Sequence, residues 1–87
     1  MAKYWVEVEK TNSRYYLDDG EYVHVDQFSI EAESLAEAVS TVKQILHIPD
    51  NATEFDRQIY TGREAVDIRY EREEYPYCYH MASIKRI

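Results

Sequence analysis

The residues of this 87-residue chain that are able to do chemistry are three histidines, one cysteine and an excess of carboxylates. His24, His47 and His80 lie far apart, and no pair among them and Cys78 has the spacing of a zinc site. Cys78 and His80 share one face of a predicted strand and could meet a third ligand, although ordinary packing explains them more simply. A catalytic Cys–His pair would also need an orienting group, which no pattern indicates.

The segment Asp18-Asp19-Gly20 resembles the start of a calcium loop, but the regular series of oxygen ligands does not follow it. A tight turn at Gly20 explains the segment more simply. The chain also contains no glycine-rich phosphate loop and no nucleophile elbow. We therefore expect a protein that is not an enzyme and holds no metal or cofactor.

The distribution of charge is more informative than these motifs. The chain has 10 basic and 17 acidic residues, and no Lys or Arg occurs between Arg14 and Lys43. The acids of that interval are Asp18, Asp19, Glu21, Asp26, Glu31, Glu33 and Glu37. Such a field repels nucleic-acid phosphates and attracts a basic protein surface. The alternative is that these acids keep a small domain soluble and, near residue 34, suit a helix N-terminus.

One helix is expected at residues 34–48, where apolar side chains recur with helical spacing. Ser34 followed by Glu37 has the pattern of a capping box, which marks the first turn. Pro49 cannot continue the helix, and Asp50-Asn51 is typical of a turn.

The remaining segments alternate with the period of a β-strand, and they are residues 3–10, 21–32, 53–61, 66–70 and 77–84. The second strand changes phase, which a bulge near Asp26-Gln27 would explain. The last strand is apolar on both faces, so it is either a central strand or one that a partner buries, and we expect a homodimer. The predicted fold is α+β in the order ββαβββ, with one helix on an antiparallel sheet of four to five strands.

The whole chain, residues 1–87, is expected to be a single domain with a small core. It contains no apolar run near the length of a membrane span and no leader pattern. A lone cysteine fits a reducing compartment, so we expect a cytoplasmic protein.

The segment from Phe28 to Val39, an alternating strand that enters a capped helix with an Ala-rich first turn, resembles small proteins encoded by phages and mobile elements. Among them it is similar to type I anti-CRISPR proteins, and the pattern covers residues 4–60. The resemblance implies an inhibitor in the bacterial host cytoplasm whose acidic and aromatic surface occupies the nucleic-acid-binding surface of a CRISPR effector.

Charge and expected exposure select the candidate partner-binding residues, which are Trp5, Tyr15, Tyr16, Asp18, Asp19, Glu21, Asp26, Glu31 and Glu33. Two other functions stay open. One is a sponge for a nucleotide signal, in which Tyr-lined pockets combine with Arg57, Arg63, Arg69 and Arg72. The other is a structural homodimer.

Overall fold

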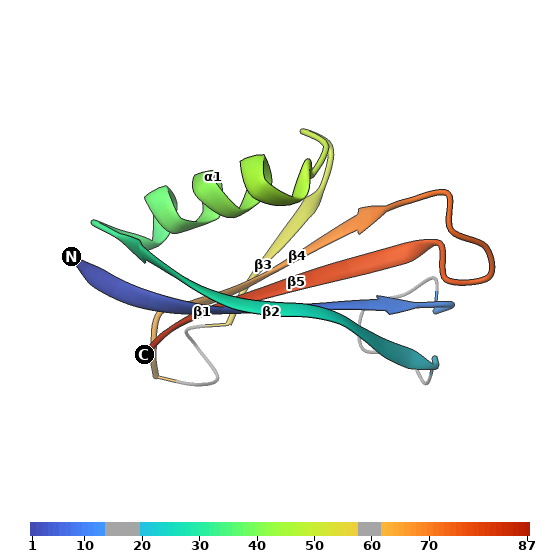
Figure 1. Cartoon of the computed structure of the whole chain (residues 1–87), viewed down its shortest axis with the longest axis horizontal. Coiled ribbons are helices and arrows are strands. Elements are labelled where there is room, and N and C mark those ends of the chain that lie inside the picture. The colour runs from blue at the N-terminus through green and yellow to red at the C-terminus, as the bar shows by residue number, and fades with distance from the viewer. Residues whose placement is uncertain (14–19, 58–61) are drawn as a thin grey trace.

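The structure is a computed structural model that describes residues 1–13, 20–57 and 62–87. It is one antiparallel sheet with a single helix on one face (Figure 1). The elements are β1 (Ala2–Thr11), β2 (Tyr22–Ala32), α1 (Leu35–Leu46), β3 (Thr53–Asp56), β4 (Ala65–Glu71) and β5 (Tyr79–Arg86). The predicted α+β fold and the order ββαβββ are confirmed.

The five strands lie in the order β2-β1-β5-β4-β3, so β5 is the central strand. It pairs with β1 on one side and with β4 on the other. Ala82 and Ile84 of β5 lie in the core on the helix side, and Tyr79 and Met81 are half-buried on the opposite face. A homodimer stays a prediction, but the backbone of β5 is already paired on both sides and offers no edge to a second copy.

One strand is shorter than the sequence predicts, and the last strand is shifted from residues 77–84 to Tyr79–Arg86. β3 ends at Asp56, and residues 58–61 of the predicted strand lie outside the described residues. β5 begins at Tyr79, because the chain turns just before it: the N–H of Tyr77 donates to the carbonyl of Glu74 over 2.8 Å.

The predicted bulge in β2 is present one residue from its expected place. Val8 pairs with Asp26 and Glu9 pairs with His24, which leaves Val25 as the extra residue. On either side of the bulge the pairing is regular, and Phe28, Ile30 and Ala32 follow one face while Gln27, Ser29 and Glu31 follow the other.

Both ends of α1 are capped. Ser34 Oγ accepts the N–H of Glu37 over 3.2 Å, as predicted, while the Glu37 carboxylate accepts the N–H of Glu33 rather than that of Ser34. At the other end His47 adopts the left-handed conformation with φ 54°, and the N–H of Ile48 reaches the carbonyl of Lys43 over 2.9 Å. This is a Schellman motif, and it ends the helix before Pro49.

The core lies between α1 and the sheet, and its members are Tyr4, Val6, Val8, Ala32, Ala38, Val42, Ile48, Val66, Ile68, Tyr70, Ala82 and Ile84. Five strands about 4.8 Å apart span about 19 Å, whereas a helix with its side chains is about 10–12 Å wide. One helix therefore cannot cover the whole sheet. It packs on β2 and β5 and leaves part of the face over β3 and β4 open.

Candidate functional site

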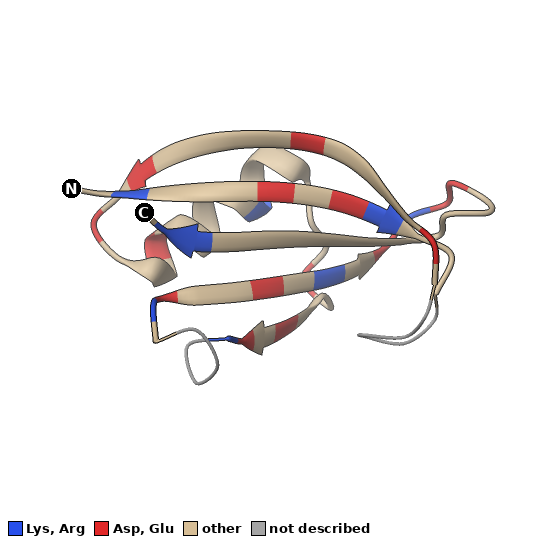
Figure 2. Cartoon of the chain, turned by 90° about the horizontal axis from the view of Figure 1, so that it is seen from below, with Lys and Arg blue, Asp and Glu red and all other residues tan. Residues whose placement is uncertain are grey.

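Four of the predicted partner-binding residues follow one edge of the sheet. Asp26 and Glu31 belong to β2, Glu21 precedes the strand, and Glu33 follows it. All four are exposed, and β2 itself contains no Lys or Arg. Figure 2 shows the acidic positions on β2 and on its neighbour β1, with basic positions on β1 confined to the strand ends. Tyr15, Tyr16, Asp18 and Asp19 lie outside the described residues.

Trp5 lies on β1, one strand in from this edge. It is half-buried on the face of the sheet opposite the helix, where it pairs with Ser29 of β2 and Lys85 of β5. Its indole Nε1 donates to Glu7 Oε1 over 2.8 Å. Trp5 therefore belongs to the open face of the sheet beside β2, and its polar atom is already satisfied.

The two bases of β1 only partly offset these acids. Lys3 pairs across the ladder with Glu31. Lys10 lies 3.9 Å from Glu74 and 5.5 Å from the centre of the Tyr77 ring, so its charge belongs to the β4–β5 connection. The edge formed by residues 21–33 therefore keeps a strongly acidic field.

The backbone of β2 is the second feature of this edge. β2 is 11 residues long, and among the described residues only β1 pairs with it. The bulge at Val25 interrupts the edge, and the Asp26 carboxylate accepts the N–H of Gln27 over 2.8 Å. Both devices protect a sheet edge from unwanted pairing. They act at one end of β2, and the segment from Phe28 to Ala32 is regular.

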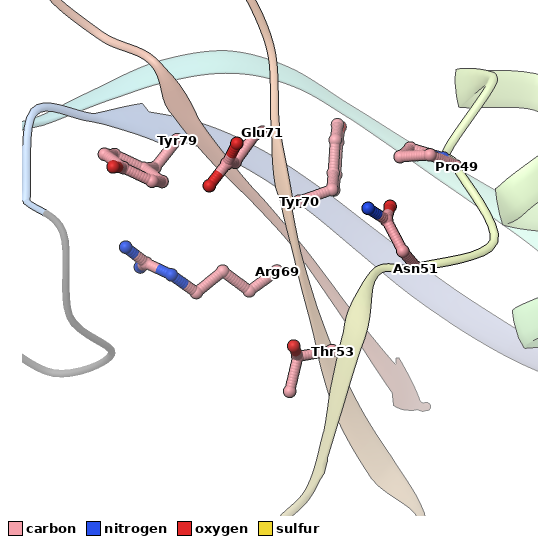
Figure 3. A pocket seen from close by; sticks show the side chains of 7 residues that line it. All are labelled: Pro49, Asn51, Thr53, Arg69, Tyr70, Glu71 and Tyr79. Atoms are coloured by element: carbon pink, nitrogen blue, oxygen red, sulfur yellow. The ribbon is translucent and has the colours of Figure 1, made fainter.

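A polar pocket of about 390 Å³ lies away from β2, where residues of β3, β4 and β5 line it together with Pro49 and Asn51 (Figure 3). The guanidinium of Arg69 lies 4.9 Å from the centre of the Tyr79 ring, and its Nη2 donates to the carbonyl of Ser13 over 2.7 Å. Arg72 lies 5.3 Å from the centre of the Tyr70 ring. Two of the four arginines named for a nucleotide site therefore do lie against tyrosines.

The other two arginines lie elsewhere. Arg57 and Arg63 line a separate cavity of about 200 Å³ together with Lys85, and Arg57 Nη1 lies 3.3 Å from the buried carboxylate of Asp67. The four guanidinium groups do not converge on one site, and Glu71 adds a negative charge to the polar pocket.

The connection of residues 71–74 contacts the end of the helix and the central strand, although Glu71, Glu73 and Glu74 are exposed. Arg72 Nη2 donates to the carbonyls of Leu46 and, over 3.1 Å, of His47, at the C-terminus of α1. Glu74 Oε2 lies 3.4 Å from Nε2 of the buried His80. A run of four charges carries no local signal for the contacts of Arg72, because Leu46 and His47 lie 26 and 25 positions earlier in the sequence.

Nε2 of His80 is buried and makes no hydrogen bond with any described residue. Burial lowers the pKa of His80, and the nearby Glu74 carboxylate opposes that shift. Within the described part of the chain no three His, Cys, Asp or Glu residues come together as a metal site, Cys78 and His80 included.

An apolar groove of about 400 Å³ runs between α1 and β3, where the helix leaves the sheet uncovered. Leu35, Ala36 and Val39 line it from the helix, and Val66 lines it from β4. Glu54 and Asp56 lie at its edge. Glu54 forms an ion pair with Lys43, in which Nζ lies 2.8 Å from Oε2.

Comparisons of this chain with protein-family models, with curated proteins and with solved structures find no match. No helix in the described residues is both long enough and apolar enough to span a membrane.

Proposed function

We propose that this chain is a non-enzymatic, phage-encoded inhibitor that acts in the bacterial host cytoplasm. It binds a basic surface of a defence complex, in the first place a type I CRISPR effector, and blocks the access of that surface to nucleic acid. The observation that carries the proposal is the acidic edge of the sheet, where Glu21, Asp26, Glu31 and Glu33 are exposed along a strand without Lys or Arg.

The physical basis is charge complementarity. A surface that binds nucleic acid is basic, and an acidic edge is attracted to it at long range and competes with phosphates for the same cations. The same field disfavours direct binding of DNA or RNA to this chain. Trp5, on the open face beside β2, supplies aromatic area next to the charges.

The test is restoration of phage growth. Cells with an active type I CRISPR system express the chain and are challenged with a phage that the system targets and with an untargeted phage. The proposal expects the targeted phage to form plaques as efficiently as the untargeted one in at least one member of a panel of type I systems. Unchanged immunity across the panel, with the chain expressed and folded, would overturn it.

A matched pair of variants ties the effect to the edge. Asp26→Lys with Glu31→Lys reverses two charges of β2, and Asp50→Lys with Glu73→Lys makes the same change of net charge at exposed positions outside β2. The first variant is expected to lose inhibition and the second to keep it. Equal loss in both would mean that only total charge matters.

A nucleotide-signal sponge is the second candidate, because Arg69 lies against Tyr79 beside the polar pocket. Calorimetric titration with cyclic dinucleotides tests it, and heat that disappears in Arg69→Met would favour it over the inhibitor. Light scattering tests the third possibility, a structural homodimer, which predicts twice the mass of one chain.

A further inference from the structure

The outer edge of β2 has the geometry of a strand-addition site. An edge strand presents a row of backbone donors and acceptors that can pair with a further strand. Beyond the bulge at Val25, the segment from Gln27 to Ala32 pairs in unbroken register with residues 2–7 of β1. A segment with regular register can continue the ladder on its other side.

The side chains around this segment are suited to a strand with alternating character. Phe28 and Ile30 lie on the helix side and are only partly buried, so apolar surface stays open there. On the other face Gln27, Ser29 and Glu31 are exposed and polar. A strand that adds to β2 would place apolar residues next to Phe28 and Ile30, and polar residues next to Glu31.

The helix adds a further apolar contact on the same side. Ile45 is 50% exposed, although α1 is packed on the sheet. Ile45 and Ala36 are nine positions apart, which is two and a half helical turns, so they lie on opposite flanks of α1. Ala36 lines the groove toward β3, so Ile45 lies on the flank toward β2.

The charge of the edge determines which kind of strand fits. A second copy of β2 would bring Asp26, Glu31 and the flanking Glu21 and Glu33 next to the same four carboxylates, without any Lys or Arg in either strand. A strand that carries Lys or Arg instead forms pairs of opposite charge with them. The same features that discourage self-association therefore favour a basic segment.

From this edge we propose that β2 binds an extended, basic segment of its protein partner by strand addition, with the apolar side chains of that segment facing Phe28, Ile30 and Ile45. This deepens the proposed function and rests on it for the basic character of the partner. The backbone of Phe28–Ala32 supplies hydrogen bonds. The carboxylate of Glu31 lies on the face of the basic side chains and selects the charge, and Asp26 adds to the acidic field.

The test uses the full chain and synthetic peptides. The probe is a fluorescent peptide that alternates Lys and Val over the length of the regular segment, and its binding is followed by anisotropy. Two versions are N-methylated, one at every Lys and one at every Val. In a strand only alternate N–H groups point toward the neighbouring strand, so the two methylated peptides differ in which edge they block.

Strand addition predicts an asymmetry between them. One methylated peptide binds like the parent and the other loses affinity by about tenfold or more, because it loses several backbone hydrogen bonds. The amide protons of Phe28–Ala32 that point away from β1 also exchange more slowly when the parent peptide is bound. A matched peptide that alternates Glu and Val does not bind.

The charge variants give the second arm. Asp26→Lys with Glu31→Lys weakens binding of the Lys–Val peptide by about tenfold, whereas Asp50→Lys with Glu73→Lys leaves it near the parent value. If both methylated peptides bind like the parent, the acidic edge attracts the peptide without pairing and strand addition is wrong.

The result is separable from the proposed function, because phage plating tests inhibition without any reference to pairing. Plating can be restored while the methylated peptides bind alike, which would refute only strand addition. If plating is not restored while the two methylated peptides differ in affinity, only the inhibitor function is refuted. If the amides of β2 become protected as protein concentration rises without peptide, a second copy occupies the edge and the proposal is overturned.

Discussion

Arg72 is the residue whose replacement tests the packing of the structure most directly. Its Nη2 donates to the carbonyls of Leu46 and His47, which are among the free carbonyls at the C-terminus of α1, and its guanidinium lies 5.3 Å from the centre of the Tyr70 ring. It thereby ties the β4–β5 connection to the end of the helix. Arg72→Met removes the charged donor and keeps an unbranched apolar stem beside Tyr70.

The expected loss follows from these contacts. A hydrogen bond to a charged donor contributes about 1.5–3 kcal/mol, and a cation near a helix C-terminus adds about 0.3–1 kcal/mol. Both bonds use one nitrogen, and the bond to His47 is exposed, so we expect about 2 kcal/mol in total rather than the sum. For a chain of 87 residues this lowers Tm by about 10 °C.

The assay is urea denaturation followed by circular dichroism, with amide exchange of Gln44–Ile48 as the local readout. Arg72→Lys keeps the positive charge but lacks the planar guanidinium with its several N–H donors. It should therefore lose only about half as much unfolding free energy as Arg72→Met. Arg86→Met is the control, because its 3.3 Å ion pair with Glu64 is exposed and contributes little. If Arg72→Met lowers the free energy of unfolding by less than about 0.5 kcal/mol, the contacts of Arg72 with the helix C-terminus do not stabilise the fold as argued.

Three further predictions concern single residues. Because burial lowers the pKa of His80, the unfolded chain takes up a proton more readily than the folded one, so this contribution to stability is complete above about pH 6.5 and is lost as pH falls below it. His80→Phe should flatten that part of a urea-denaturation series measured from about pH 7 to about pH 5. Gly20→Ala should cost about 1–3 kcal/mol by thermal denaturation, because its Cβ would lie 2.3 Å from Ser13 Cβ. His47→Gly should raise the free energy of unfolding by up to about 1 kcal/mol, since His47 holds φ 54°.

Local patterns were sufficient to predict the elements of this fold. The apolar spacing of residues 35–46 and the hydroxyl of Ser34 are signals within a few residues of each other, and the helix forms where they place it. β5 places Ala82 and Ile84 in the core under the helix, while Tyr79 and Met81 are half-buried on the opposite face. The spacing of apolar residues and the capping hydrogen bonds involve residues that are close in sequence, so a single sequence reveals them.

The contacts of the β4–β5 connection were not predictable in the same way. Arg72 reaches carbonyls 25 and 26 positions away, and those carbonyls exist as acceptors only because the helix ends at that point. His80 is buried because its strand is central. At Gly20 the close approach of Ser13 excludes a side chain, which no local pattern indicates. Each of these facts depends on the topology of the sheet.

The acids illustrate how sequence and topology combine in the candidate site. Their density between Arg14 and Lys43 is visible in the sequence, but the sequence does not say whether they lie on a loop, a central strand or an edge. The sheet order places β2 at the edge. Natural edges are commonly protected by lysine, which repels other edges of the same kind. Carboxylates repel a second copy of the same edge in the same way, but they attract a basic strand instead of an acidic one. The proposed preference of β2 for a basic partner and its repulsion of a second β2 therefore follow from the same charges.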